Sequence, residues 1–563
     1  MKQIALIGLM TAGWLLAGPS KGNDAKVSPE ILKSNDAEVD VLLVYEDNDD
    51  DSSRLQREEK VRAFGGRNYR NFQGAGVGAV RANRALLNEL KNDSKIRFIA
   101  PDRQIKSTAT SGSAEYDQIE VRTVLGVSSS TGETGSAVGV AVIDSGVNKL
   151  IGLGTSGSCS TSRVVYSQNF ASDSGTDDQY GHGSHVASIL GSNSSCDASY
   201  STSVAPGVKI INLRVLNAWG FGFDSAVVAA IDRAITLKST YNIRVMNLSL
   251  GRPVFDSFIN DPLCQAVERA WKAGIVVVAA AGNMGRWPTT EGYGTIASPG
   301  NDPFVITVGA TRDPYKGLTQ SRTDDTIATY SSKGPTALDH IVKPDLVAPG
   351  NLMIARTAFP STLTTLFPGS VKTYPRISGS FFTLSGTSMA APVVAGAAAL
   401  LIQKDSSLTP DQVKARLMKT AWKGMAATAS IYDSLTNTTY NVQQDIFTVG
   451  AGYLDIAAAL ANIQKIGSTQ SAISPRAVQS NGKVVLTTSY STPSGLNVIW
   501  GDSSTWATNV IWGDSVLLAN NVIWGDNVIW GSNVSSGYNV IWGDNVIWGD
   551  SVSFPLEAEQ GDN

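Results

Sequence analysis

The stretch 385–392 reads SGTSMAAP and places the hydroxyl of Ser388 between a glycine turn and a run of small and apolar residues. That pattern predicts a side chain presented in the first turn of a buried helix. The unpaired N–H groups of such a turn and the positive end of the helix dipole favour an anion formed beside the hydroxyl, which suits a nucleophile. The alternative is an ordinary Thr or Ser cap in front of a core helix. Other segments of the sequence must decide whether Ser388 is a nucleophile or a cap.

A carboxylate directly follows one of the apolar runs. Residues 140–143 read VAVI and lead straight into Asp144 and a Ser-Gly turn. The carboxyl end of a buried parallel strand is where a doubly wound sheet keeps its chemistry, so Asp144 is a candidate catalytic group. Taken alone, it also fits an ordinary turn residue at a strand end.

Two of the three histidines lie in residues 181–188, GHGSHVAS. His182 stands between glycines at the start of a helix of small residues, where a substrate has access, and is the candidate general base. His185 is interpreted as a helix residue packed near it. The H-x-x-H spacing of His182 and His185 could also bind a metal ion, but His182 is not followed by the Glu of the H-E-x-x-H zinc motif.

A neutral amide ends another predicted strand. Residues 276–283 read VVVAAAGN, so the side chain of Asn283 would lie at the same edge of the sheet as Asp144. An amide donor there is suited to hold a developing oxyanion. The alternative is a simple Gly-Asn turn.

From Tyr116 onward, short apolar runs rich in β-branched residues alternate with helical segments. This alternation predicts an α/β fold with a doubly wound, mostly parallel sheet and helices on both faces. Strands are expected at 138–143, 208–215, 244–250, 275–281 and 304–308, and helices after His182 and at 224–237, 262–272, 387–403 and 410–420. Before this region, residues 39–101 read as a βαββαβ unit, which ends in a Ser/Thr/Gly-rich stretch at 107–113 that is suited to cleavage.

Together, VAVIDSGV around Asp144, GHGSHVAS around His182, AAAGN at Asn283 and SGTSMAAPVVAG around Ser388 closely resemble the subtilisin-like serine proteases. The order Asp, His, Ser distinguishes this fold from other triad folds. The resemblance covers about residues 116–460, and Ser184 departs from it where Thr is usual. Supporting segments are 204–210, 247–251, 304–310, 330–335 and 343–350.

The resemblance implies a role for each motif. His182 would take the proton of Ser388, Asp144 would orient the imidazole, and the Asn283 amide with the Ser388 N–H would bind the oxyanion. Ser249, Leu250 and Gly251 would form an edge to which the substrate backbone adds as a strand. That edge would wall the pocket before the cut together with Ala281 and Gly282, and its small residues imply broad specificity with apolar side chains preferred.

The βαββαβ unit is similar to the inhibitory, chaperone-like propeptides of the same family. The expected organisation is a signal peptide at 1–20, a ferredoxin-like propeptide at 21–110, a catalytic domain at 111–465, a Ser/Thr/Gly-rich linker at 466–496 and repeats at 497–556. The alternatives are an N-terminal membrane anchor in place of the signal, and a fixed N-terminal domain in place of the propeptide.

The amino-acid composition limits the classes of partner and cofactor that this protein is expected to bind. Of 563 residues, 42% are hydrophobic and 17% are charged, which indicates several folded units. The formal net charge of −4 argues against nucleic acid or an anionic membrane as partner. Of three cysteines, Cys159 and Cys196 flank His182, so we favour a disulfide between them. No cofactor is required for the chemistry; structural calcium is frequent in the family, and the acidic loop 173–178 is a candidate without a readable ligand spacing.

A hexapeptide, NVIWGD, begins at 497 and recurs in phase at 509, 521, 527, 539 and 545, where the copy at 527 ends in Ser532 instead of Asp. The unbroken register predicts a repeating β-rich structure, either short hairpins or a small β-solenoid. Its tryptophan face is either the core of the repeat or a surface for cell wall, glycan or protein.

The sequence therefore predicts a secreted serine endopeptidase that cleaves polypeptides through an acyl-enzyme and matures itself from a zymogen, with its own propeptide as inhibitor. The alternatives are a catalytically silent protein that attaches to a surface through the Trp-rich repeats, and an esterase using the same triad. The strand-edge segment disfavours the esterase because it suits a polypeptide substrate.

Overall fold

The computed structural model describes most of the chain between residues 23 and 487 and short parts of the repeats. The expected signal peptide at 1–20, Cys196 and most of the repeat region lie outside the described residues. The described ranges are 23–107, 110–111, 118–127, 132–149, 152–155, 158–193, 203–288, 290–314, 321–373, 380–433, 437–467, 470–480, 483–487, 497–498, 521–524 and 539–542.

The larger domain is built on one sheet with the strand order β10, β11, β7, β13, β15, β16, β17, and with β18 also beside β16. All neighbours are parallel except β16 and β17. Every residue of β7 and β15 is buried, as expected for strands covered on both faces. The predicted mostly parallel sheet is confirmed. Its strands are β7 (Gly139–Asp144), β10 (Val164–Asn169), β11 (Lys209–Arg214), β13 (Ile243–Leu248), β15 (Val276–Ala280), β16 (Ile306–Arg312), β17 (Thr326–Ile327) and β18 (Leu346–Pro349).

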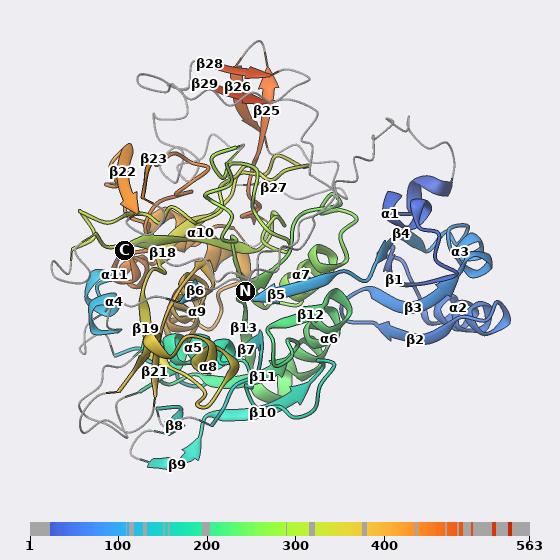
Figure 1. The fold of residues 1–563 in the computed structure, drawn as a ribbon, viewed down its shortest axis with the longest axis horizontal. Helices are drawn as coiled ribbons and strands as arrows, with labels where there is room; N and C mark the ends of the chain where they lie inside the picture. Colours follow the sequence, from blue (N-terminus) through green and yellow to red (C-terminus); the bar gives the residue numbers. More distant parts are fainter. Residues whose placement is uncertain are drawn as a thin grey trace, which may run out of the picture.

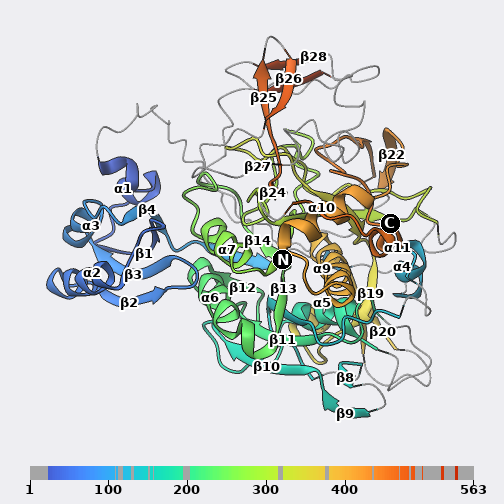
Figure 2. The same ribbon diagram turned by 180° about the vertical axis from the view of Figure 1, so that it is seen from behind.

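The main helices cover this sheet from two sides (Figures 1 and 2). Helices α6 (Asp224–Tyr241) and α7 (Pro262–Lys272) pack together on the side of the N-terminal domain, and α5 (His182–Gly191) packs with α9 (Thr387–Lys404) on the other side. Helix α9 is long and apolar enough for a membrane span by composition, but 89% of it is buried inside the protein, so it is a core helix. The helices predicted at 262–272 and 410–420 are confirmed to the residue by α7 and α10 (Pro410–Thr420).

Smaller sheets and helices complete the larger domain. β5 (Gln104–Ser107) lies between β12 (Phe221–Phe223) and β14 (Leu250–Gly251), and β21 (Phe381–Ser385) pairs with β6 (Thr110–Ser111), β19 (Met353–Arg356) and β20 (Val371–Lys372). The remaining elements are β8 (Gly154–Thr155), β9 (Ser158–Ser162), β22 (Thr428–Asp433), β23 (Thr438–Gln443), α4 (Gln118–Val124), α8 (Thr362–Leu366), α11 (Ile456–Ala461) and the 3-10 turn η2 (Pro368–Ser370).

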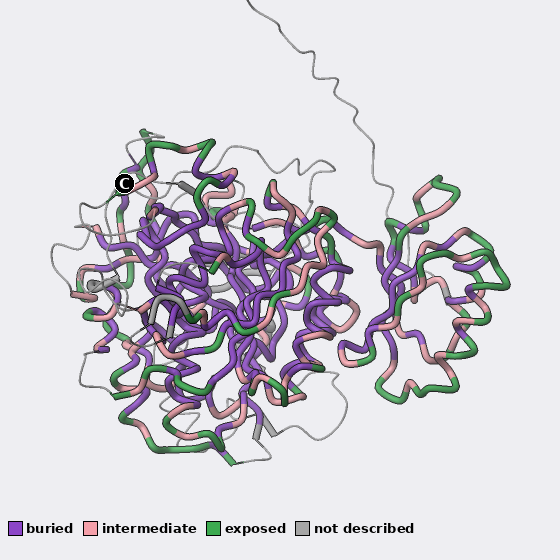
Figure 3. Tube along the Cα trace, turned by 90° about the horizontal axis from the view of Figure 1, so that it is seen from below, coloured by how far each residue is buried: buried purple, intermediate pink, exposed green. Residues whose placement is uncertain are grey.

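The N-terminal region forms a separate α+β domain. Its antiparallel sheet has the order β2, β3, β1, β4, and α2 and α3 complete the predicted ferredoxin-like βαββαβ pattern. It has its own buried cluster, and it lies beside the larger domain, where most of the buried residues are found (Figure 3). Its elements are η1 (Asn23–Lys26), α1 (Pro29–Lys33), β1 (Glu38–Tyr45), α2 (Asp51–Ala63), β2 (Arg67–Phe72), β3 (Val77–Asn83), α3 (Arg84–Leu90) and β4 (Ile96–Pro101).

Three short strands of the repeat region are described, and the first, β27 (Asn497–Val498), pairs in parallel with β24 (Gln470–Ser471). β28 (Asn521–Trp524) pairs in parallel with β29 (Asn539–Trp542), so equivalent residues three hexapeptides apart are aligned. Tight hairpins join antiparallel strands only, so parallel pairing favours the solenoid over the hairpin. The structure of the repeat region as a whole stays a prediction.

The segment that follows α11 is more structured than the Ser/Thr/Gly-rich linker expected at 466–496. It contains β24 (Gln470–Ser471), β25 (Arg476–Ser480) and β26 (Lys483–Thr487). Ala472, Ile473 and Ser474 are buried in the larger domain. The small polar residues that suggested a linker are there used as buried hydrogen-bonding groups.

Ser474 completes a buried charge cluster. Its hydroxyl accepts a hydrogen bond from Lys414 Nζ at 2.8 Å and donates one to the carboxylate of Asp345. Lys343 Nζ lies 2.7 Å from the same carboxylate, and all three charged side chains are fully buried. Burial opposes the ionisation of Asp345, but the two lysines outweigh it and lower its pKa. A buried charge is tolerated when it is paired and hydrogen-bonded, so the segment around Ser474 is part of the domain.

We therefore expect the stability of C-terminally truncated chains to fall sharply once the segment around Ser474 is removed. In a Ser388→Ala background, which prevents self-digestion, a chain ending at Thr487 should unfold at the temperature of the full chain. A chain ending at Gly467 should lose at least about 3 kcal/mol, because it loses a hydrogen-bonded partner of buried charges and the burial of Ile473. Thermal unfolding measures both; equal melting temperatures for the two truncations would contradict the assignment.

Candidate active site

The carboxyl ends of three neighbouring strands bring the candidate residues to one edge of the sheet. Ile143 of β7 pairs with Leu248 of β13, which pairs in turn with Ala279 of β15. The residues that follow these positions are Asp144, Ser249 and the segment leading to Asn283. The predicted convergence is therefore a consequence of the strand register.

Asp144 and His182 form a buried hydrogen-bonded pair. Oδ1 of Asp144 lies 2.7 Å from Nδ1 of His182, and both side chains are fully buried. Gly183, the next residue of α5, makes this approach possible, because a Cβ there would meet the carbonyl oxygen of Gly146 at 2.2 Å. His182 Nε2 is buried and makes no hydrogen bond within the described residues. The imidazole is thus held by one nitrogen while the other is available for proton transfer.

Asp178 fixes the start of α5 against the end of β7. Its carboxylate accepts hydrogen bonds from the backbone N–H groups of Gly181 and Ser184 and from the hydroxyl of Ser145, at 2.7, 2.7 and 2.8 Å. The Ser145 hydroxyl in turn accepts the N–H of Gly183 at 2.9 Å. Burial raises the pKa of Asp178. Sequence reasoning missed this role, because Asp178 lies four residues before the first residue of α5 and not at its N-cap position, which is Gly181.

Two carboxylates of the acidic loop 173–178 are engaged in contacts within the protein. Asp173 forms a bidentate pair with Arg214, with both N–O distances 2.7 Å, and Asp178 is saturated by N–H and O–H donors. Within the part of the chain that the structure describes, no group of three or more His, Cys, Asp or Glu side chains is arranged to hold a metal ion. These two carboxylates therefore do not fit a calcium site in this loop.

Ser388 lies in the first turn of α9 and is locked to Ser249. Its Oγ donates to the carbonyl oxygen of Ser249 at 3.0 Å, and the Ser249 hydroxyl donates to the carbonyl oxygen of Ser388 at 2.8 Å. The side chain of Asn247 donates to the same Ser249 hydroxyl at 2.9 Å. Because Ser249 directly follows β13, these bonds hold the start of α9 at the edge where Asp144 lies.

Asn283 is oriented by the residue that the sequence reading treated only as a helix cap. The amide oxygen of Asn283 accepts both the N–H and the hydroxyl of Thr387, each at 3.0 Å. The Thr387 hydroxyl also accepts the N–H of Gly282 at 3.0 Å. With its oxygen bound in this way, the amide turns its NH₂ group away from Thr387, as an oxyanion donor requires.

The predicted substrate edge is paired with a strand of the chain itself. Leu250 and Gly251 form β14, which pairs antiparallel with Ser107 and Lys106 of β5. Ala281 and Gly282 are buried beside this edge, and the N–H and carbonyl groups of Ala281 are both bonded within the domain. Leu250 and Gly251 thus pair with an extended peptide in the manner expected of a substrate.

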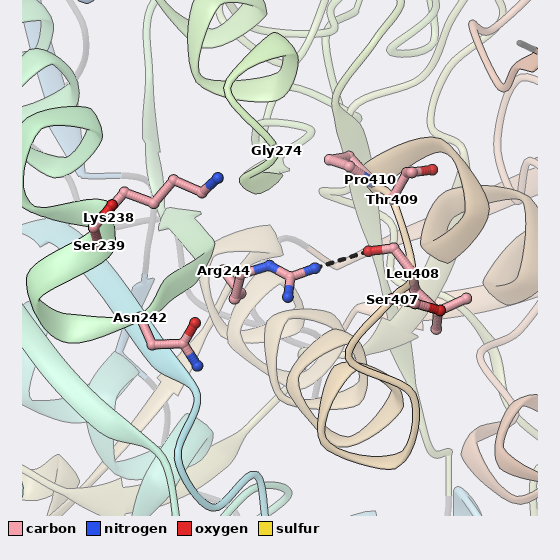
Figure 4. A pocket seen from close by; sticks show the side chains of 9 residues that line it. All are labelled: Lys238, Ser239, Asn242, Arg244, Gly274, Ser407, Leu408, Thr409 and Pro410. Carbon is pink, nitrogen blue, oxygen red and sulfur yellow. Dashed lines mark hydrogen bonds between the residues drawn. The ribbon is translucent and has the colours of Figure 1, made fainter. Parts of the chain in front are cut away.

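A separate open pocket lies at the opposite, amino-terminal end of the parallel strands (Figure 4). It has a volume of about 420 Å³ and contains none of the candidate catalytic residues. Arg244 is bound there to the carbonyl oxygens of Ser406 and Leu408. The pocket is lined by Lys238, Ser239, Asn242, Arg244, Gly274 and residues 407–410.

Two further predictions from the sequence concern the cysteines and His185. The disulfide between Cys159 and Cys196 is untested because Cys196 lies outside the described residues, and Cys264 is a buried free thiol. His185 donates from Nε2 to the carbonyl oxygens of Phe382 and Met353 at 2.9 and 3.1 Å. Burial lowers the pKa of His185 to about 3, so it is a neutral packing residue.

Known proteins resemble this chain over most of its length. The Subtilase family profile matches residues 135–452. Serine protease AprX of Bacillus subtilis is 34% identical over 366 residues, which cover 64% of this chain and 76% of AprX. Subtilisin E of Bacillus subtilis is 30% identical over 371 residues, which cover 66% of this chain and 81% of subtilisin E.

The fold has a solved relative as well. Fervidolysin from Fervidobacterium pennivorans, described as a keratinolytic enzyme related to subtilisin, matches with a TM-score of 0.54 and 22% identity. The match covers 76% of this chain and 61% of fervidolysin. By class, the chain is a subtilisin-like serine peptidase. It belongs to the subtilase family.

We expect Thr387 to act on catalysis through Asn283. Thr387→Val removes the hydroxyl but not the volume, so kcat should fall about tenfold with little change in KM, less than the 10²- to 10³-fold loss typical of removing an oxyanion donor itself. Thr387→Ser keeps the hydroxyl and is the control. Steady-state kinetics on a chromogenic peptide measure the effect; a rise in KM alone would contradict this role.

The neutral state of His185 predicts a defined pH dependence of stability. Below the ordinary histidine pKa of 6.5, His185 binds a proton in the unfolded chain, whereas in the native state it stays neutral down to about pH 3. The free energy of unfolding therefore decreases as the pH falls from 6.5 to about 3. His185→Gln retains an N–H donor and should reduce the slope by up to about 1.4 kcal/mol per pH unit. Urea unfolding of both proteins at pH 7 and 5, in the Ser388→Ala background, measures the difference. An equal loss of unfolding free energy in both proteins between pH 7 and pH 5 would contradict this role of His185.

Proposed function

We propose that the chain is a secreted serine endopeptidase with the triad Asp144, His182 and Ser388. The observation that carries the proposal is the buried Asp144–His182 pair at the sheet edge to which Ser249 anchors Ser388. His182 Nε2 takes the hydroxyl proton as Ser388 Oγ attacks the peptide carbonyl carbon. The leaving amine takes this proton, and water then hydrolyses the acyl-enzyme. Asn283 and the Ser388 N–H bind the oxyanion.

We also propose that the N-terminal domain is an inhibitory propeptide. It docks on α6 and α7 through several polar contacts. Asp232 of α6 accepts the N–H groups of Gly74 and Ala75 at 2.6 and 3.2 Å, and Arg269 of α7 pairs with Asp47 at 2.8 Å. From this domain β5 extends into the larger domain and occupies the strand edge at 250–251 (Figure 1). A strand held there competes with any substrate.

Two residues before β5 fasten this strand. Asp102 accepts the N–H of Ser225 in the first turn of α6 at 2.9 Å, which is a favourable place for a carboxylate. Arg103 is 9% exposed, pairs with Asp256 at 2.7 Å and lies over the ring of Phe255. Both contacts lie on the N-terminal side of β5, so they support retention of the domain after cleavage beyond Ser107.

Substrate range, location and the role of the repeats are part of the same proposal. Broad specificity is supported by the small, uncharged residues of the segment 249–251 and of Ala281 and Gly282. Extracellular action is supported by the signal-like residues 1–20 and by similarity to alkaline proteases and subtilisins. The repeat region is proposed as an attachment to a surface, glycan or protein, in addition to catalysis.

The proposal is tested by comparing the wild type with Ser388→Ala. The wild type should cleave casein, react with a serine-directed phosphonate at Ser388 and appear by mass spectrometry without its N-terminal domain covalently attached. Ser388→Ala should do none of these and remain full length after signal removal. Identical processing of both proteins would exclude self-maturation, and a silent wild type would favour the binding protein.

Arg103 should control the delay before activity appears. Arg103→Ala removes the contacts with Asp256 and Phe255, so the cleaved N-terminal fragment should dissociate sooner and the lag before peptide hydrolysis should shorten severalfold. Arg67→Ala is the matched control, because Arg67 pairs with Glu38 on an exposed strand of the N-terminal domain. Progress curves after dilution of freshly secreted protein measure the lag; an equal lag in all three proteins would contradict the role of Arg103.

A further inference from the structure

The carbonyl group of Ser388 cannot make the usual hydrogen bond of an α-helix. In such a helix, each carbonyl oxygen accepts the backbone N–H of the residue four positions later. For Ser388 that residue is Pro392, which lies inside α9 and has no N–H. The proline ring also crowds the carbonyl four positions before it, which favours a carbonyl that turns away from the helix axis. A donor from another element can therefore take the place of the missing bond.

Ser249 supplies such a donor from the edge of the sheet. Its hydroxyl donates to the Ser388 carbonyl oxygen at 2.8 Å. The N–H at the other end of the same peptide unit belongs to Met389, and it donates to the carbonyl oxygen of Gly386 at 2.9 Å. The peptide unit between Ser388 and Met389 is thus held at both ends. An anchored peptide unit keeps the Cα atom of Ser388, and with it the start of the side chain, in one position.

Asn247 sets the direction of the hydrogen bond from Ser249. The side-chain amide of Asn247 donates to the Ser249 hydroxyl at 2.9 Å, and both side chains are fully buried. A hydroxyl has one proton to donate and two lone pairs that accept. Because the amide N–H occupies a lone pair, the proton of the hydroxyl is left for the carbonyl of Ser388. The hydrogen bonds therefore run in one direction, from Asn247 through Ser249 to Ser388.

We propose that Ser249 and Asn247 are positioning residues for the nucleophile; this inference rests on the proposed function. Ser388 is in the first turn of α9, and helix ends fray unless other groups hold them. The Ser249 hydroxyl replaces the helical bond that Pro392 removes. Since Ser249 directly follows β13, the nucleophile is held relative to the sheet edge that carries Asp144, and not by α9 alone. A misplacement of about 1 Å at a reacting group can cost about 10²-fold in rate.

Removal of the Ser249 hydroxyl tests this role. Ser249→Ala keeps the backbone of the strand edge, so KM on a chromogenic peptide should stay within about twofold of the wild type, while kcat should fall about tenfold. Rates are expressed per Ser388 titrated with a serine-directed phosphonate. Ser203→Ala is the matched control, because the buried Ser203 hydroxyl donates to the carbonyl oxygen of Ser192 at 2.7 Å. Its kcat should equal that of the wild type.

Pro392→Ala gives the sharper test, because it restores the N–H that the helix lacks. In this background the Ser388 carbonyl has a helical donor, so Ser249→Ala should lower kcat by no more than about twofold. Such non-additivity is expected when two residues act on one group. A tenfold loss in both backgrounds would mean that the hydroxyl acts in another way and would overturn the inference. An unchanged kcat in Ser249→Ala alone would overturn it as well.

A second variant and a folding control complete the experiment. Asn247→Ala leaves the Ser249 hydroxyl without its donor and should lower kcat about threefold, again only while Pro392 is present. This variant carries the test if Ser249→Ala does not fold, and an unchanged kcat would then overturn the inference. Thermal unfolding in the Ser388→Ala background establishes which variants fold. A wild type that does not hydrolyse the peptide would overturn the proposed function itself, whereas an active wild type with unaffected variants would overturn this inference alone.

Discussion

The hydrogen bond between Asp144 and His182 is the contact on which the arrangement of the site depends. Both side chains are fully buried, so the pair exists only if the end of β7 and the start of α5 are held at a fixed separation. Asp178 provides that separation, because its carboxylate binds two N–H groups of the α5 start and the hydroxyl of Ser145 beside Asp144. A buried carboxylate saturated by donors is rigid, and it holds the Asp144–His182 pair in place without contacting it.

The strand edge at β14 pairs with β5 of the chain itself and, by our proposal, also binds the substrate. Strand addition at β14 uses backbone hydrogen bonds, which any extended peptide can make. The N-terminal domain adds contacts with α6 and α7 that a free peptide lacks, and its covalent link to the larger domain gives it a high effective concentration. Under our proposal, inhibition needs no special chemistry at Ser388, only a peptide that is held in place more firmly than a substrate.

Periodicity and strand ends made much of this structure predictable. Asp144 and Asn283 follow strands with clear apolar runs, so their position at one edge of the sheet could be inferred from these runs and the parallel topology, whereas Ser249 was predicted only through the family resemblance. Ser474 could not be predicted, since its role depends on a carboxylate 129 residues away in the sequence. Thr387 carries a capping pattern in the sequence, and only the structure shows that its hydroxyl holds Asn283 instead. Short elements such as α8 and β5 have too few residues for any period.

Under the proposed maturation, cleavage would not by itself remove the N-terminal domain. The contacts of Asp102, Arg103, Asp232 and Arg269 all lie on the N-terminal side of β5 or within the docked domain, so they persist after a cut beyond Ser107. Burial raises the pKa of both Asp102 and Asp256, and each binds its partner as a carboxylate. Acidification would therefore weaken these two contacts at a higher pH than it would weaken exposed ion pairs. If the N-terminal domain is the inhibitory propeptide that we propose, activation takes two steps, hydrolysis and then loss of the docked domain, and the second step is the one that the pH of the solution can influence.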